Sequence, residues 1–202
     1  LCTGLLWKYS LSSADEKVRA KGVDIVKKGC EAARELGARV LLVVPAVATA
    51  EMPYEKTWEL AKNGVLQAAK TAQENSVILG VENVWNKFLY SPLEFRAFLR
   101  EINHSHVKMY IDPGNLLQIA HPTQWIEMLR DYITCVHVKD YDAEEMAFKP
   151  LMEGTVPWRQ IVEKLREIGY DYYLNVELSP YKGDELKAAE DAKAALDKLL
   201  KT

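Results

Sequence analysis

Short runs of β-branched and aliphatic residues recur along this chain of 202 residues, and each run ends at or beside a side chain that can bind a metal ion. There are four of them: 76–83 with Glu82, 107–112 with Asp112, 133–137 with His137, and 172–177 with Glu177. Runs of this length and composition, bounded by turn or helix signals, predict β-strands. A chain with this design is therefore expected to carry functional groups at the ends of its strands.

Helical patterns separate the predicted strands. The first helix follows a capping box at Ser13-Ala-Asp-Glu16 and ends at Leu36, and the second spans 54–74. Three more helices begin at Ser91-Pro-Leu-Glu94, at Pro122 and at Pro157, and a last helix closes the chain over about 184–200. Residues 2–7 are predicted to be the end of a strand that runs into a loop, and 40–44 are predicted to form another strand. A polar loop is expected over 139–154. The order, β followed by five αβ repeats and a last α, is typical of βαβ units with a parallel sheet.

A (β/α)₈ barrel lacking its first two βα units fits this order best. An open doubly wound sheet usually carries a Gly-rich phosphate turn after its first strand, and this chain has none there. Barrels of this class place their functional groups at the carboxyl ends of the strands, which is where the four metal-competent side chains fall. We expect residues 1–202 to form one domain.

Composition excludes several classes of partner. The formal net charge is −3 and basic residues are interspersed with acidic ones, so we expect no nucleic-acid partner. No apolar run reaches the roughly 18 residues that cross a bilayer. The three cysteines have no metal-finger spacing, and we interpret them as reduced thiols of a cytoplasmic protein.

Three carboxylates and one imidazole at the mouth of a barrel would bind a divalent ion. The oxygen-rich set favours Mn²⁺ or Mg²⁺, and the histidine also admits Co²⁺ or Zn²⁺. A single carboxylate at a strand end is weak evidence, because it can equally pair with a lysine or cap the next helix. Four such side chains in phase on consecutive strands favour the metal site.

Five sequence motifs resemble those of the xylose isomerase-like TIM barrels, in particular their sugar and sugar-phosphate isomerases and epimerases. They are Glu82-Asn-Val-Trp-Asn, Asp112-Pro-Gly-Asn115, His137-Val-Lys-Asp140, Gly154-Thr-Val-Pro-Trp158 and Val176-Glu177. The resemblance covers nearly the whole chain. By it, residues 2–6 would end the third strand of the barrel.

The resemblance implies roles for these residues. Glu82, Asp112, His137 and Glu177 would bind the metal, and Glu82 and Glu177 would also act as acid and base on either side of a metal-bound cis-enediolate. The partner would be a small-molecule sugar or sugar phosphate and the protein a homo-oligomer, a dimer or tetramer. Candidate substrate contacts are Trp85, Asn115, Lys139 and Trp7, with Trp158 as a further possible wall of the pocket.

Two positions depart from the free-ketose epimerases. Asn115 stands where these enzymes carry a histidine, and Ala143 stands where they carry an arginine. The histidine and the arginine of those enzymes would bind substrate hydroxyls. Because this chain lacks both, the identity of its substrate stays open.

Other readings stay open for the activity. These are a metal-dependent dehydratase of a polyol ketone, an apurinic-site endonuclease and a non-catalytic sugar-binding barrel. The acidic charge and the four widely spread histidines count against the endonuclease. Because a barrel without its first strands has uncovered sheet edges, we expect this chain to be weakly active or inactive alone.

Overall fold

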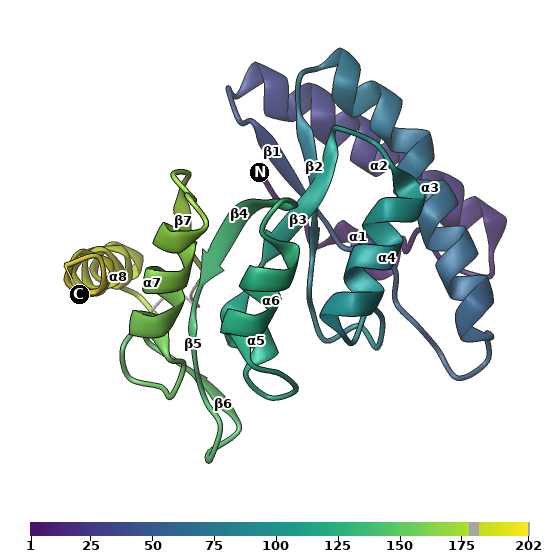
Figure 1. Ribbon diagram of the computed structural model, residues 1–202. Helices are drawn as coiled ribbons and strands as arrows, with labels where there is room; N and C mark the ends of the chain where they lie inside the picture. The colour runs from purple at the N-terminus through teal and green to yellow at the C-terminus, as the bar shows by residue number, and fades with distance from the viewer. Residues whose placement is uncertain (178–181, 202) are drawn as a thin grey trace. The chain divides into compact units, whose positions relative to one another are not determined.

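The computed structural model describes residues 1–177 and 182–201 and divides the chain into two compact units (Figure 1). The first unit comprises residues 1–110 and 132–134, and the second comprises 111–131 and 135–202. The main sheet has the strand order β1-β2-β3-β4-β7. Its strands are β1 (Val40–Val43), β2 (Ile78–Glu82), β3 (Val107–Ile111), β4 (Ile133–Val138) and β7 (Leu174–Val176). The pairs β1–β2, β2–β3 and β4–β7 are parallel, which confirms the sheet type that the alternating pattern predicts.

In the first unit, β1 pairs with β2 and β2 with β3, so that Glu82 lies opposite Tyr110. All four residues of β1 are buried, as expected for a parallel strand that is covered on both faces. The helices of this unit are α1 (Leu5–Lys8), α2 (Glu16–Glu35), α3 (Tyr54–Glu74) and α4 (Pro92–Ile102). Helices α2 and α3 lie side by side, and α3 also contacts α4.

In the second unit, the end of β4 pairs with β7, and His137 lies opposite Asn175. The helices here are α5 (Pro113–Leu116), α6 (Pro122–Leu129), α7 (Trp158–Glu167) and α8 (Glu185–Leu199). Helix α7 packs against both α6 and α8 (Figure 1). Trp125 on α6 is 1% exposed, in keeping with its position on the apolar face of the predicted helix.

The start of the chain differs from its predicted structure. Residues 2–7 do not form a strand, because the chain turns at Gly4 into the short helix α1. Leu1 alone pairs with the edge of the sheet: its ammonium group donates to the carbonyl of Val40, and its carbonyl accepts from the N–H of Leu42, each at 2.9 Å.

Of the two predicted capping boxes, the structure confirms the one at Ser91 and not the one at Ser13. Ser91 caps α4 as expected, since its hydroxyl accepts from the N–H of Glu94 at 3.2 Å. The box at Ser13 was wrong: the cap of α2 is Asp15, whose carboxylate accepts from the N–H of Lys17 at 2.8 Å. An ionised side chain one residue before the helix satisfies the free N–H and also complements the helix dipole, so Asp15 is the better cap.

The predicted polar loop over 139–154 contains a small antiparallel hairpin. Its strands are β5 (Asp140–Asp142) and β6 (Ala147–Lys149), with Tyr141 opposite Phe148. The predicted strand 172–177 is shorter in the structure, because β7 spans only Leu174–Val176.

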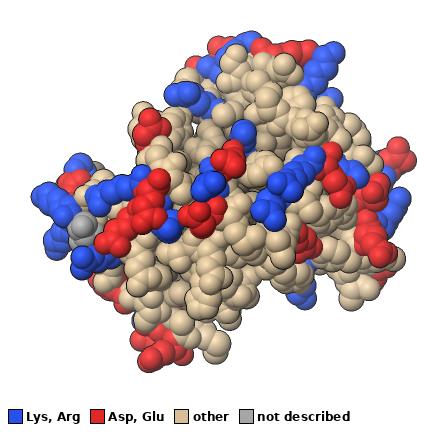
Figure 2. Space-filling model, viewed as in Figure 1, with Lys and Arg blue, Asp and Glu red and all other residues tan. Residues whose placement is uncertain are grey.

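Surface charges are mixed in sign. On the face drawn in Figure 2, acidic and basic side chains are interspersed over the helices instead of forming a patch of one sign. Several of them are neighbours on one helix, such as Lys193 and Asp197 on α8. In residues 1–177 and 182–201 no helix has the length and apolar character needed to cross a membrane.

Candidate metal centre

The four metal-competent side chains stand where the sequence places them, at the carboxyl ends of strands. Glu82 is the last residue of β2, Asp112 follows β3 directly, His137 is the fifth residue of β4, and Glu177 follows β7. Parallel strands bring their carboxyl ends to the same edge of a sheet. In the second unit this edge is fixed by the backbone, because the N–H of Glu177 donates to the carbonyl of Val138 at 3.0 Å.

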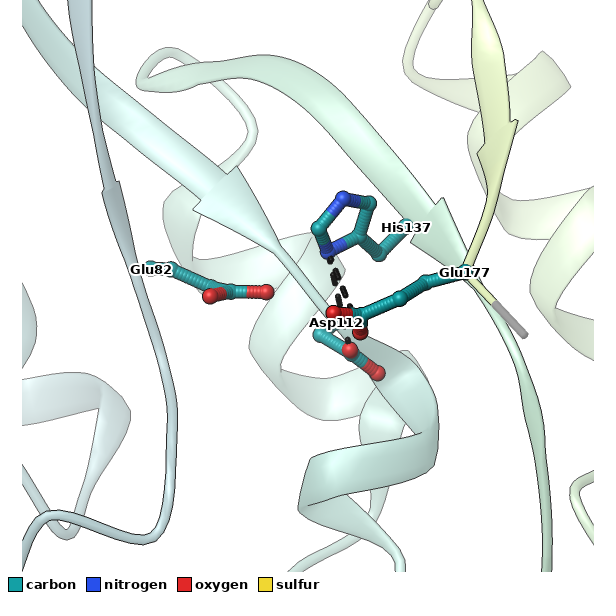
Figure 3. Close-up of side chains that lie close together, drawn as sticks. All are labelled: Glu82, Asp112, His137 and Glu177. Atoms are coloured by element: carbon teal, nitrogen blue, oxygen red, sulfur yellow. Dashed lines mark ion pairs between the residues drawn. The ribbon is translucent and has the colours of Figure 1, made fainter. Parts of the chain in front are cut away.

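Asp112, His137 and Glu177 converge within the second unit. Each offers one potential ligand atom, and these atoms lie within 4.8 Å of one another. The Nδ1 atom of His137 is 3.8 Å from Oδ2 of Asp112 and 3.6 Å from Oε2 of Glu177. Figure 3 shows both carboxylates pointing toward the imidazole ring, with dashed lines marking these two pairs. The three donors therefore surround a common point.

Asp112 divides its two oxygens between the fold and the site. Oδ1 accepts from the N–H of Asn115 at 3.0 Å and so caps the short helix α5. Oδ2 faces His137 and the ammonium group of Lys139. The residue is 0% exposed, and burial raises the pKa of its carboxyl against the pull of the nearby Lys139 cation. A buried carboxylate of this kind needs a cation beside it.

Lys139 supplies that cation. Its Nζ atom lies 3.0 Å from Oδ2 of Asp112 and 2.6 Å from Oε2 of Glu177, although the side chain is only 14% exposed. Burial opposes the charged form, but the two carboxylates outweigh it and raise the pKa of Lys139 above its usual value. The ammonium also lies over the ring of Phe148, 4.8 Å from its centroid. The lysine is thus held charged by two acids and one aromatic face.

Glu177 is the most exposed member of the group, with half of its side chain accessible. Burial works against its charged form, yet the hydrogen bond and charge of Lys139, together with His137, lower the pKa of its carboxyl. It therefore stays ionised at neutral pH and faces solvent, which suits a group that accepts a proton from a small molecule.

Glu82 belongs to the first unit, where it is 6% exposed. Its position at the end of β2 follows from the ladder with β3, in which it pairs with Tyr110, two residues before Asp112. It stands at the carboxyl end of its strand, as predicted for a metal ligand.

The chemistry of the donors fits a divalent cation. Carboxylate oxygens are the ligands of Mg²⁺ and Mn²⁺, and one imidazole among them also suits Zn²⁺ or Co²⁺. Acidic groups this deeply buried are rarely left without a cation, and here a lysine ammonium already stands beside two of them. The residues that are present therefore fit a single ion.

Two residues of the sequence motifs, Gly114 and Asp140, support the site in ways that the sequence alone does not predict. A Cβ atom on Gly114 would lie 2.6 Å from the carbonyl oxygen of Lys139, so only glycine lets the Asp112 turn approach β4 this closely. Asp140 is 1% exposed and accepts hydrogen bonds from the N–H groups of Tyr141, Met152 and Val156. It fixes the segment that follows Lys139.

The predicted substrate contacts lie in different settings. Trp7 on α1 and Trp85 after β2 are 49% and 46% exposed, whereas the side chain of Asn115 is buried and Lys139 is held by the carboxylates. Trp158 is 3% exposed at the start of α7, so its expected place in a pocket wall was wrong and it packs in the core. Phe148 was missed, because it lies in the hairpin that was predicted as a loop.

Comparison with known proteins shows the family of the chain and a similar sequence. The family described as xylose isomerase-like TIM barrel matches residues 1–201. L-ribulose-5-phosphate 3-epimerase UlaE of Escherichia coli O157:H7 is 26% identical over 195 residues, which are 96% of this chain and 68% of that protein.

Solved structures give the same fold. The structure of an L-ribulose 3-epimerase matches with a TM-score of 0.81 at 22% identity, over 95% of this chain and 71% of that one. The structure of IolI protein with a binding zinc atom matches with a TM-score of 0.81 at 18% identity, over 93% of this chain and 72% of that one. These similarities confirm the barrel fold that the order of strands and helices predicts.

Proposed function

Because the chain belongs to the xylose isomerase-like TIM barrel family, we propose that it forms a divalent-metal-dependent epimerase or isomerase of a ketose or ketose phosphate. One observation carries the proposal: potential ligand atoms of Asp112, His137 and Glu177 lie within 4.8 Å of one another at the ends of their strands. The resemblance of the chain to an L-ribulose-5-phosphate 3-epimerase supports the reaction class.

Asp112, His137, Glu177 and Glu82 would hold the ion. When bound, a divalent cation polarises the carbonyl of a ketose and stabilises the negative charge that develops on its oxygen. The buried position of Asp112 favours tight binding, because little water competes for its carboxylate. Of the candidate ions we favour Mn²⁺, since most of the donors are oxygens and one is an imidazole nitrogen.

The proton transfers fall to the two glutamates. Glu177, ionised and half exposed, is suited to take the proton from the carbon next to the carbonyl. The electron pair of the broken C–H bond then forms the carbon–carbon double bond of an enediolate. Glu82, as a protonated acid, returns a proton to the opposite face of the same carbon for epimerisation, and the original carbonyl re-forms. For isomerisation it returns the proton to the former carbonyl carbon, and the proton of the adjacent hydroxyl moves to the former carbonyl oxygen as the new carbonyl forms. Exchange of both glutamates with solvent restores the starting state.

Substrate contacts are proposed for four residues. Trp85 and Trp7 are exposed aromatic side chains that can pack against a sugar ring, and Lys139 and Asn115 can bind its oxygens. With Asn115 and Ala143 in place of a histidine and an arginine, the grip on substrate hydroxyls differs from that of free-ketose epimerases. A phosphate group on the substrate would then supply binding energy that those hydroxyls do not.

The setting of the protein completes the proposal. All three cysteines are free thiols, of which Cys30 and Cys135 are buried, in keeping with a cytoplasmic enzyme. The homo-oligomer, a dimer or tetramer, is part of the proposal as an implication of the family resemblance.

Deuterium exchange tests the proposed function. The Mn²⁺-loaded protein is incubated in D₂O with a panel of ketoses and ketose phosphates, and the sugars are followed by NMR. Because the chain is expected to be weakly active or inactive alone, the same test is made on the full-length protein. We expect deuterium next to the carbonyl of at least one sugar with the full-length protein, and its loss in Glu177→Gln. Glu145→Gln is the matched control, because Glu145 also pairs with a lysine but lies on the exposed hairpin. Exchange that persists in Glu177→Gln would contradict the assigned base.

A further inference from the structure

The ammonium group of Lys139 occupies an unusual place for a lysine. It contacts Oδ2 of Asp112 at 3.0 Å and Oε2 of Glu177 at 2.6 Å. These are the same two oxygen atoms that face Nδ1 of His137, at 3.8 and 3.6 Å. The lysine is therefore bound to the atoms that a metal ion would use, and its side chain is 14% exposed.

A divalent ion and this ammonium cannot share the two oxygens on equal terms. Carboxylate oxygens bind divalent transition-metal ions at about 2.0–2.2 Å, with the metal at the place where their lone pairs converge. The two cations would then repel each other beside Asp112, which is fully buried, and buried charges interact more strongly than charges in solvent. Because the ion carries twice the charge of the ammonium, the two carboxylate oxygens bind the ion and lose their contacts with Lys139.

The displaced ammonium would keep one of its present contacts, the aromatic ring of Phe148. The face of Phe148, on strand β6, lies 4.8 Å from Nζ, and a cation over an aromatic ring is favoured when it is partly desolvated. Phe148 is 48% exposed, so an ammonium group over its ring is accessible from solvent. A small movement of the lysine side chain toward the ring would leave its charge close to the site and within reach of an incoming molecule.

We propose that Lys139 is a resident counter-cation of the metal centre: it holds Asp112 and Glu177 together before a divalent ion binds, and it gives up their oxygens to the ion. This inference rests on the metal centre of the proposed function. It makes Lys139 a competitor of the metal as well as a substrate contact, since the lysine is freed for oxygens of the substrate when the ion enters.

The alternative is a lysine that merely stabilises the fold or arranges the ligands. Both readings predict that removing the ammonium destabilises the metal-free protein, because two carboxylates lose their partner. They differ in the sign of the effect on metal binding. A lysine that arranges the ligands strengthens the binding of the ion, whereas a counter-cation weakens it.

The test compares the unmodified 202-residue chain with Lys139→Met, which removes the charge and keeps much of the side-chain length. Mn²⁺ affinity is measured by calorimetry, and the melting temperature is measured in EDTA and in Mn²⁺. Lys62→Met is the matched control, because Lys62 also bridges two carboxylates, Glu59 at 3.2 Å and Glu101 at 2.9 Å, with a side chain 19% exposed.

For Lys139→Met we expect a lower melting temperature in EDTA, at least tenfold tighter Mn²⁺ binding, and a larger stabilisation by Mn²⁺ than in the unmodified chain. Lys62→Met should leave the Mn²⁺ affinity unchanged. An affinity for Mn²⁺ that is unchanged or weaker in Lys139→Met would overturn the inference and leave the metal centre intact. Failure of the unmodified chain to bind Mn²⁺ would instead refute the metal centre, and the inference with it.

Crystals of the unmodified chain provide a second test that does not depend on the folding of a variant. Structures determined with and without Mn²⁺ should differ in the distance from Nζ of Lys139 to Oδ2 of Asp112. We expect that ion pair to be broken when the ion is bound. A contact kept near 3.0 Å beside a bound ion would overturn the inference.

Discussion

Asp140 should be one of the most costly residues of the second unit to replace. It is 1% exposed, and its carboxylate accepts from the N–H groups of Tyr141 at 3.0 Å, Met152 at 2.9 Å and Val156 at 3.2 Å. These bonds tie β5 to the chain segment that leads into α7. They also fix the residue that follows Lys139, so the carboxylate supports the geometry of the metal centre.

The magnitude follows from which donors are buried. In Asp140→Ala the N–H groups of Tyr141 and Val156 lose their acceptor in residues that are 1% and 7% exposed, whereas Met152 is 49% exposed and its N–H can bind water. A hydrogen bond to a charged group contributes about 1.5–3 kcal/mol, so two such losses should lower the free energy of unfolding by about 3–5 kcal/mol. Asp140→Asn should cost less, because an amide oxygen can keep the bonds that Oδ1 accepts.

Urea unfolding followed by circular dichroism measures this difference. With a slope of about 1–3 kcal/mol per molar urea, the midpoint should fall by more than 1 M in Asp140→Ala. The matched control is Asp142→Ala: its carboxylate also accepts two backbone N–H groups, from Glu144 and Glu145, but on an exposed turn. The control should cost about 1 kcal/mol or less. Equal losses in Asp140→Ala and Asp142→Ala would refute the role given to buried donors.

Two further predictions follow from close approaches and from burial. Gly114→Ala should destabilise the protein by about 1–3 kcal/mol and weaken Mn²⁺ binding in calorimetry, because its Cβ would press on the carbonyl of Lys139. Gly4→Ala is the control, since a Cβ at Gly4 meets nothing within 4 Å. Equal effects of the two changes would contradict this prediction. Burial raises the pKa of Cys30 to about 11, so that at pH 8 about one thiol in a thousand is ionised. Iodoacetamide should therefore modify the exposed Cys2 and spare Cys30, with labelling of Cys30 rising about tenfold per pH unit from pH 8 to 10; mass spectrometry that finds both cysteines labelled alike at pH 8 would count against it.

The sequence predicts the strands and their functional ends well, because both depend on local patterns. Continuous apolar runs such as 40–43 can be buried on both faces only in a parallel sheet, and parallel strands bring Asp112, His137 and Glu177 to one edge. The family resemblance then assigns these residues to a metal site. The position of each ligand was thus set by strand order and strand length alone.

Features that depend on distant contacts could not be predicted in this way. The hairpin of β5 and β6 has strands of three residues each, which are too short for a periodic pattern to be recognised, so the sequence predicts a loop. The burial of Asp140 depends on donors 12 and 16 residues away. The bridge that Lys139 makes depends on Glu177, 38 residues later in the chain. At Ser13 the error was local, since Asp15, two residues further on, is the better cap.

The proposed metal centre is tested most directly by anomalous diffraction from crystals grown with Mn²⁺ and recorded at the manganese absorption edge. The account predicts one anomalous peak per chain, about 2.0–2.3 Å from carboxylate oxygens of Glu82, Asp112 and Glu177 and from a ring nitrogen of His137. A peak elsewhere would contradict it, and so would no peak at all in crystals whose dissolved protein retains Mn²⁺.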